Sequence, residues 1–237
     1  MIPMRFWDTL DPRARLLIVL AATVACVSVP RGELQPYALF FPAILLLMFT
    51  SRSLDWVHIL TRCAASSPFI LLAGLMLLFQ YGIDAQGRPE GLIPVAGIIA
   101  KGYSAALLLA FLGSSTGLAQ ILWAMRKLGA PESLNMILAM MFRYTSLLSE
   151  EWQKLQRARD SRTVRPLQGL KLANVYGRQL GTLLVRSWDR ADRIHAAMLS
   201  RGFHGVWPVR EQSSWHMRDT LAVVLIPALF VAIRLFR

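Results

Sequence analysis

The chain has 237 residues, a formal net charge of +12 and a hydrophobic content of 55%. Soluble domains usually contain roughly 45 to 50% apolar residues, so this composition favours a membrane protein over a soluble enzyme. The two cysteines, Cys26 and Cys63, both lie in apolar stretches. We interpret them as packing residues, because such an arrangement suggests neither a disulfide framework nor a cysteine-rich metal site.

Five apolar segments approach the length of about 20 residues that a transmembrane helix needs. They cover residues 16–29, 34–49, 64–81, 92–112 and 221–233. The charged N-terminus is interpreted as leading into a retained first span, since no convincing cleavage site follows it. Lys101, inside the fourth segment, is expected to snorkel or to face protein. The pattern predicts an all-α membrane protein with about five transmembrane helices.

Basic residues in the short loops predict the orientation. Arg5, Arg13 and Arg15 precede the first segment, and Arg52 and Arg62 separate the second from the third. Because cytoplasmic loops carry the excess of Lys and Arg, we expect a cytoplasmic N-terminus. Four spans then also place the strongly basic central region in the cytoplasm. The expected division is residues 1–115 as N-terminal transmembrane helices, 116–218 as cytoplasmic coupling helices, and 219–237 as a C-terminal transmembrane helix.

The central region is predicted to form two long amphipathic helices. The first is expected to begin at Pro131-Glu132 and to stop at Pro166, and the second to use Gly202 as its C-cap. Apolar residues recur in both at spacings of three and four, with basic residues on the other side. The stripes include Met140, Tyr144, Leu148 and Trp152 in the first helix and Leu180, Leu184, Trp188 and Ile194 in the second, opposite Arg186, Arg190 and Arg193.

Each amphipathic helix ends in the same pattern, Ala-x-x-Ser-Arg, as "ARDSR" at 158–162 and "AMLSR" at 197–201. A guanidinium at a helix end can enter a partner's groove and satisfy several acceptors at once. We therefore interpret Arg162 and Arg201 as docking residues. The other arginines suit anionic lipid headgroups. Nucleic-acid binding is not expected, because the basic helices carry no aromatic platform for base stacking.

The sequence contains little that suggests catalysis. "GIIAKGYS" at 97–104 lacks the glycine spacing of a phosphate-binding loop, and the four histidines show no ligand spacing. We expect no catalytic residues, no metal site and no cofactor on this chain. If folding brought two histidines together, they would be His204 and His216. Asp11 before Pro12 is interpreted as a helix cap.

Several stretches, in order, resemble one known family. They are "LDPRARLL" at 10–17, "ILWAMRKLGAPESL" at 121–134, "FRYTSLLSEEWQKLQRARDSR" at 142–162 and "RSWDRADRIHAAMLSRGF" at 186–203. Together they resemble the T components, or transmembrane scaffold subunits, of energy-coupling factor transporters, in particular the cobalt-transport subclass often called CbiQ. The resemblance covers nearly the whole chain.

In that family, two coupling helices each end in an X-Arg-X motif whose arginine docks into one of two ATP-binding cassette ATPase subunits. The resemblance places these motifs at Ser161-Arg162-Thr163 and Ser200-Arg201-Gly202. Thr163 stands where the family commonly has glycine. An alternative alignment centres the first motif on Arg159.

The resemblance implies a scaffold in the bacterial inner membrane that couples ATP hydrolysis by two partner ATPases to uptake of a divalent metal ion, in the first place cobalt. A separate substrate-binding S component would bind the metal. The expected coupling surface comprises Met140, Tyr144, Leu148, Trp152, Leu184 and Trp188.

Three alternatives stay open. The first is an energy-coupling factor scaffold for nickel or a vitamin. The second is a conventional permease, disfavoured because the five spans show no buried ion pairs and because permeases usually couple through one loop. The third is a lipid-binding or structural membrane protein without partners.

Overall fold

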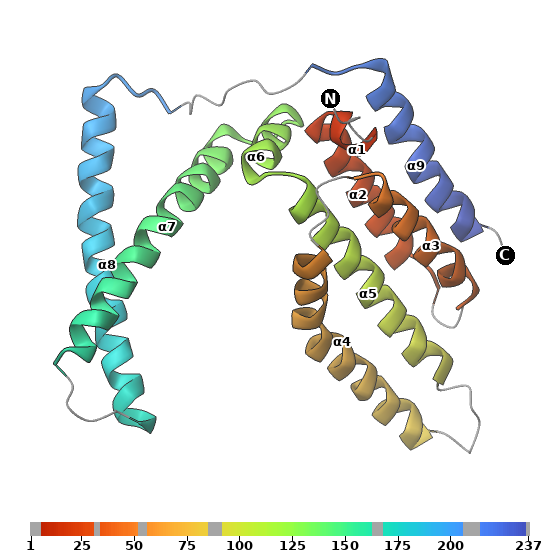
Figure 1. The fold of residues 1–237 in the computed structure, drawn as a ribbon, viewed down its shortest axis with the longest axis horizontal. Helices are drawn as coiled ribbons and strands as arrows, with labels where there is room; N and C mark the ends of the chain where they lie inside the picture. The colour runs from red at the N-terminus through yellow and green to blue at the C-terminus, as the bar shows by residue number, and fades with distance from the viewer. Residues whose placement is uncertain are drawn as a thin grey trace. The chain divides into compact units, whose positions relative to one another are not determined.

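The computed structural model describes residues 6–30, 34–51, 56–84, 92–162, 168–205 and 214–235, and all regular structure within these ranges is helical. The prediction of an all-α chain is confirmed. The helices are α1 (Phe6–Thr9), α2 (Pro12–Val27), α3 (Gln35–Phe49), α4 (Trp56–Asp84), α5 (Leu92–Ser115), α6 (Leu118–Lys127), α7 (Glu132–Asp160), α8 (Gly169–Ser200) and α9 (Met217–Leu235) (Figure 1).

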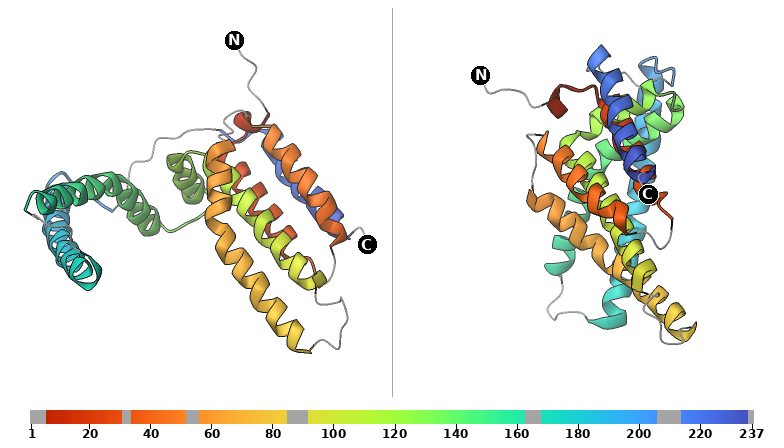
Figure 2. Two further views of the ribbon diagram at one scale, coloured as in Figure 1. Left: turned by 60° about the horizontal axis from the view of Figure 1, so that its bottom comes forward. Right: turned by 90° about the vertical axis from the view of Figure 1, so that its right-hand side faces the viewer.

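The chain forms two compact units. The bundle unit comprises Met1–Leu128 and Arg210–Arg237, and the hairpin unit comprises Gly129–Val209. Each of the five predicted apolar segments forms a helix of the bundle unit: α2, α3, α4, α5 or α9. In this unit α2 packs against α5, α6 and α9, whereas α4 packs along α5 (Figure 2).

Two helices, α4 and α5, are long and apolar enough to cross a membrane within the described part of the chain. The apolar stretch of α4 has almost no fully buried residues, as expected of a helix that faces lipid. At 1.5 Å per residue, the 16 residues of α2 and the 15 of α3 extend only about 24 and 22 Å. Membrane crossing by these shorter helices stays a prediction.

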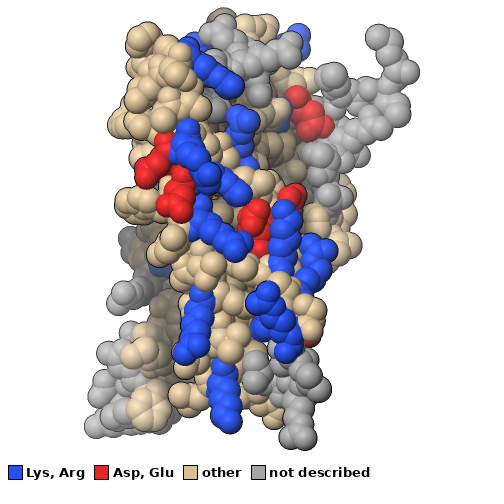
Figure 3. Space-filling view, turned by 90° about the vertical axis from the view of Figure 1, so that its left-hand side faces the viewer, with Lys and Arg blue, Asp and Glu red and all other residues tan. Residues whose placement is uncertain are grey.

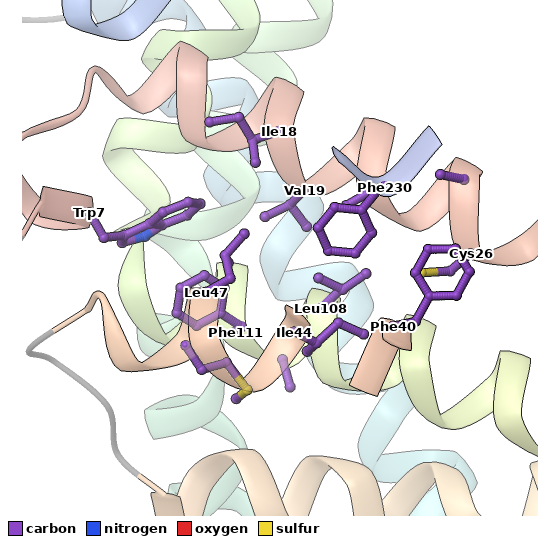
Figure 4. Close-up of a cluster of buried hydrophobic side chains, with 14 of the residues drawn as sticks. Trp7, Ile18, Val19, Cys26, Phe40, Ile44, Leu47, Leu108, Phe111 and Phe230 are labelled. Carbon is purple, nitrogen blue, oxygen red and sulfur yellow. The ribbon is translucent and has the colours of Figure 1, made fainter. Parts of the chain in front are cut away.

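An aromatic core holds the bundle unit together. Trp7 packs on Phe111 with ring centroids 4.8 Å apart, and Phe40 stacks on Phe230 at 5.7 Å. These side chains come from α1, α5, α3 and α9, so four helices meet in one cluster (Figure 4). Cys26 is a buried free cysteine of the same cluster, which confirms its interpretation as a packing residue.

Lys101 faces protein, as predicted. Its Nζ donates a 2.6 Å hydrogen bond to the carbonyl of Val29, just beyond the C-terminal end of α2. The last carbonyls of a helix lack partners within the helix, and an ammonium group is a strong donor to them. The ammonium group of Lys101 is therefore hydrogen-bonded to the chain just after α2 and not left in an apolar environment without a partner.

Charged residues are buried where α2 and α9 begin. Asp11 caps α2, as predicted, by accepting a 2.9 Å hydrogen bond from the backbone N–H of Arg13. Arg15 and Asp219, however, are only 6% and 2% exposed. Both lie just before the predicted apolar segments 16–29 and 221–233, and their burial was not predicted, because it depends on contacts between residues far apart in the sequence.

Candidate functional site

The candidate site is the hairpin of α7 and α8. The N-cap of α7 is Pro131 and the helix ends at Asp160, which confirms the predicted start and the position of Arg162 just beyond the end. The helices run antiparallel. Trp152 stacks on Tyr176 with ring centroids 5.9 Å apart, and Gln179 Nε2 donates a 3.0 Å hydrogen bond to the carbonyl of Leu155.

Arg159 is engaged inside this hairpin. Its guanidinium lies 4.8 Å from the ring centroid of Tyr176, and its Nη2 lies 2.8 Å from Oδ1 of Asp160. Hydrogen bonding to Tyr176, and then to Asp160, raises the pKa of Arg159 above its usual value. The side chain is 16% exposed, so Arg159 serves the packing of α7 on α8.

The two Ala-x-x-Ser-Arg motifs adopt the same local geometry. In the first, the Ser161 hydroxyl donates to the carbonyl of Ala158 at 3.0 Å; in the second, the Ser200 hydroxyl donates to the carbonyl of Ala197, also at 3.0 Å. Each motif thus ties its serine back onto the last turn of its helix.

The arginines that follow these serines also match. The backbone N–H of Arg162 donates to the carbonyl of Arg159 at 2.9 Å, and that of Arg201 to Met198 at 3.1 Å. Both side chains are exposed, and among the described residues neither forms an ion pair or hydrogen bond. The helix bounds differ by one position: Ser161 is the C-cap of α7, whereas Ser200 is the last residue of α8.

Gly202 closes α8 as predicted. Its φ is +77°, its N–H donates to the carbonyl of Leu199, and the N–H of Phe203 donates to that of Met198, both at 3.0 Å. This is the Schellman arrangement, which requires a left-handed residue and therefore favours glycine. The corresponding residue of the first motif, Thr163, lies outside the described residues.

The expected coupling surface divides into two faces. Met140, Tyr144, Leu148 and Trp152 are half-buried and face α8. The first three line a mainly apolar groove of about 290 Å³ with residues such as Ile194 and Met198. Leu184 and Trp188 are instead 68% and 71% exposed. These two residues thus lie on the exposed part of the apolar stripe of α8, and the role of all six residues in coupling stays a prediction.

Basic side chains gather along the hairpin unit, with acidic ones among them (Figure 3). Arg186 and Arg193 are exposed, as predicted, but Arg190 is half-buried, lines the groove and lies 3.4 Å from Glu151. Lys154 lies 3.5 Å from the same carboxylate; its charge, more than the contact with Arg190, lowers the pKa of Glu151. Sequence reasoning missed the role of Glu151 and assigned Arg190 to the solvent face.

This geometry suits contact with proteins. It presents two matched exposed arginines, an exposed apolar face on α8 and a groove between the helices. Within the described ranges, no group of three or more His, Cys, Asp and Glu residues is arranged to hold a metal ion.

Comparison with known proteins gives the family. The family CbiQ, described as cobalt transport protein, matches residues 4–215. Two uncharacterized proteins of Methanocaldococcus jannaschii are similar in sequence. MJ1089 is 28% identical over 130 residues, which is 54% of this chain and 46% of that protein. MJ1571 is 32% identical over 82 residues, which is 35% of this chain and 28% of that protein. The matches thus span less than half the length of these relatives.

Proposed function

Because this chain belongs to the CbiQ family of cobalt transport proteins, we propose that it is the transmembrane scaffold, or T component, of an energy-coupling factor importer. It is an all-α membrane protein. Two partner ATPases hydrolyse ATP, a separate S component binds the cation, and this chain transmits movement between them. The chain itself is not an enzyme. It lies in the bacterial inner membrane, with its N-terminus and hairpin unit in the cytoplasm.

The observation that carries this proposal is the matched pair of exposed arginines at the ends of α7 and α8. An exposed guanidinium held at a helix end is free to enter an acidic or carbonyl-lined groove, where it can form several charge-assisted hydrogen bonds. Two equivalent ends suit two ATPase subunits. The packing of Arg159 on Tyr176 favours Arg162 over Arg159 as the centre of the first motif.

The rest of the hairpin unit supports transmission of movement. The stacked rings of Trp152 and Tyr176, the hydrogen bond from Gln179 and the contact between Arg190 and Glu151 join α7 to α8. A displacement at one docked end therefore moves both helices together. The exposed face around Leu184 and Trp188 is the part of α8 that can contact the S component.

Substrate choice belongs to the S component. Cobalt is the substrate that we propose first, because the family is described as cobalt transport protein. The alternative is a scaffold for the uptake of nickel or a vitamin. Co-purification distinguishes a scaffold, which brings two ATPases and a small membrane subunit, from a conventional permease, which brings ATPases alone.

The docking test compares Arg162→Ala and Arg201→Ala with Arg186→Ala, an exposed arginine on the basic face of α8. Leaving buried acceptors unpaired costs about 1 to 3 kcal/mol, so each docking variant should bind the ATPases roughly 5- to 150-fold more weakly. Arg186→Ala should bind nearly as the wild type does. Equal losses in all three variants would contradict docking by specific arginines and indicate a diffuse charge effect.

A further inference from the structure

The hairpin unit is an insertion in the bundle unit. The chain leaves the bundle unit after α6 and returns to it before α9. Any force that the hairpin unit exerts on the bundle unit through the chain therefore passes through these two attachment points. If α6 and α9 are held firmly in the bundle unit, that force moves the bundle. If they are held loosely, only these two helices move.

Arg15 holds the end of the chain that leads into α6. Its three guanidinium nitrogens donate to three carbonyls: Nε to Leu10 at 3.1 Å, Nη2 to Asp8 at 2.8 Å and Nη1 to Ser115 at 3.3 Å. Ser115 is the last residue of α5, two residues before the N-cap of α6. A cation at the C-terminal end of a helix satisfies its free carbonyls and opposes its dipole.

Asp219 holds the start of the chain that returns. One carboxylate oxygen accepts the backbone N–H of Asp11 at 2.9 Å, and the other accepts that of His216 at 2.8 Å. The first bond ties α9 to the start of α2, and the second caps α9 itself. Between α2 and α6, the Arg13 guanidinium lies 4.5 Å from the ring centroid of buried Trp123.

We propose that Arg15 and Asp219 are positioning residues that fix the two attachment points of the hairpin unit against α2. Burying a charged group costs free energy, and here hydrogen bonds to the backbone offset that cost. Because these bonds are directional, they fix the positions of the backbone segments that they join. The pair therefore keeps the movement of α7 and α8 coupled to the bundle. Its effect on transport rests on the proposed function, whereas its effect on the position of the hairpin unit does not.

The test uses the full complex with Asp219→Asn and, separately, Arg15→Lys. Asparagine keeps the shape of Asp219 but replaces one of its two acceptors with a donor, and lysine replaces the three-nitrogen fork of Arg15 with one nitrogen. Asp192→Asn, on an exposed position of α8, is the matched control. The measurements are subunit co-purification, ATP hydrolysis, uptake and the distance distribution between spin labels at Ala65→Cys on α4 and Ala196→Cys on α8.

We expect both anchor variants to assemble and hydrolyse ATP, to lose uptake by about fivefold or more, and to show a broader distance distribution than the control. A parallel fall in hydrolysis and uptake with an unchanged distribution would overturn the proposal, as would no change at all. Failure of both variants to assemble would also overturn it, because the pair would then serve folding alone. If the Arg162 and Arg201 variants still bound the ATPases, the docking proposal would fail while the distance result still decided this one.

Discussion

The exposed apolar face of α8 gives a sharp test of coupling through Leu184→Glu. Leu184 is 68% exposed, and it lines a groove together with Leu148 and Leu183. Full burial of a leucine side chain contributes about 1.5 to 3 kcal/mol, so the third of it that is buried contributes about 0.5 to 1 kcal/mol. The substitution should therefore leave the hairpin folded.

The same charge should prevent an apolar partner from packing on this face, because a carboxylate buried without a partner loses its hydration. In the reconstituted complex we expect Leu184→Glu to retain ATP hydrolysis and to lose uptake, with a thermal unfolding midpoint close to that of the wild type. Thr182→Glu is the control, since it adds the same charge two residues away on an exposed position of the polar side. Leu148→Glu, which faces α8, should instead destabilise the hairpin and lose both activities.

Proportional loss of hydrolysis and uptake in Leu184→Glu, or no loss of either, would refute the assignment of this face to coupling. Equal uncoupling by Thr182→Glu would do the same, because the effect would then follow charge and not the apolar surface.

Three further outcomes are expected. Arg159→Ala should lower the thermal unfolding midpoint of the chain, by loss of the contact with Tyr176, while a pull-down shows ATPase binding intact; weakened binding would favour Arg159 as the docking residue. Gly202→Ala should cost about 1 to 2 kcal/mol of backbone strain at φ +77°, with no steric clash, and hydrogen exchange should report fraying of the last turn of α8. The isolated chain should neither hydrolyse ATP nor bind cobalt or nickel stoichiometrically at micromolar concentration in calorimetry; such binding would direct attention to His204 and His216.

The helices could be predicted from the sequence because their signals are local. Apolar runs, the Asp11-Pro12 cap and the Pro131-Glu132 start each depend on neighbours within a few residues, and all three were confirmed. α4 is the exception in length, since it begins eight residues before its predicted apolar segment. Hydropathy identifies the apolar part of a helix, which suits lipid. It does not identify the polar turns by which the same helix continues.

The faces of α8 could not be predicted, because apolar residues cover a wide arc of this helix. Leu183 and Leu184 are adjacent in sequence, yet only Leu183 is half-buried. Which part of a wide apolar arc meets the neighbouring helix depends on the crossing of the two helices, and periodicity alone does not contain that information. Arg190 was misplaced for the same reason.

The anchor formed by Arg15 and Asp219 was missed because its contacts are distant in sequence. Asp11 and Asp219 are 208 positions apart, and each acid by itself suggests only a cap or a surface residue. Arg15 was counted as a basic residue in predicting the orientation. In the structure its guanidinium donates hydrogen bonds to three backbone carbonyls. A charge count treats such an arginine like a solvated one, although its hydrogen bonds give it a different role.

The two Ala-x-x-Ser-Arg motifs have a shared local structure. In both copies the serine hydroxyl donates a hydrogen bond to the carbonyl of the alanine. The backbone N–H of the arginine donates to the carbonyl three residues before it. After the arginine, the second motif continues into Gly202, whose left-handed conformation favours glycine. The serine and the arginine are therefore the features that a partner could recognise in the same way at both ends. Because the serine and arginine contacts are common to both motifs, loss of either arginine should weaken ATPase binding, and a pull-down in which only one of the two variants lost binding would contradict this equivalence.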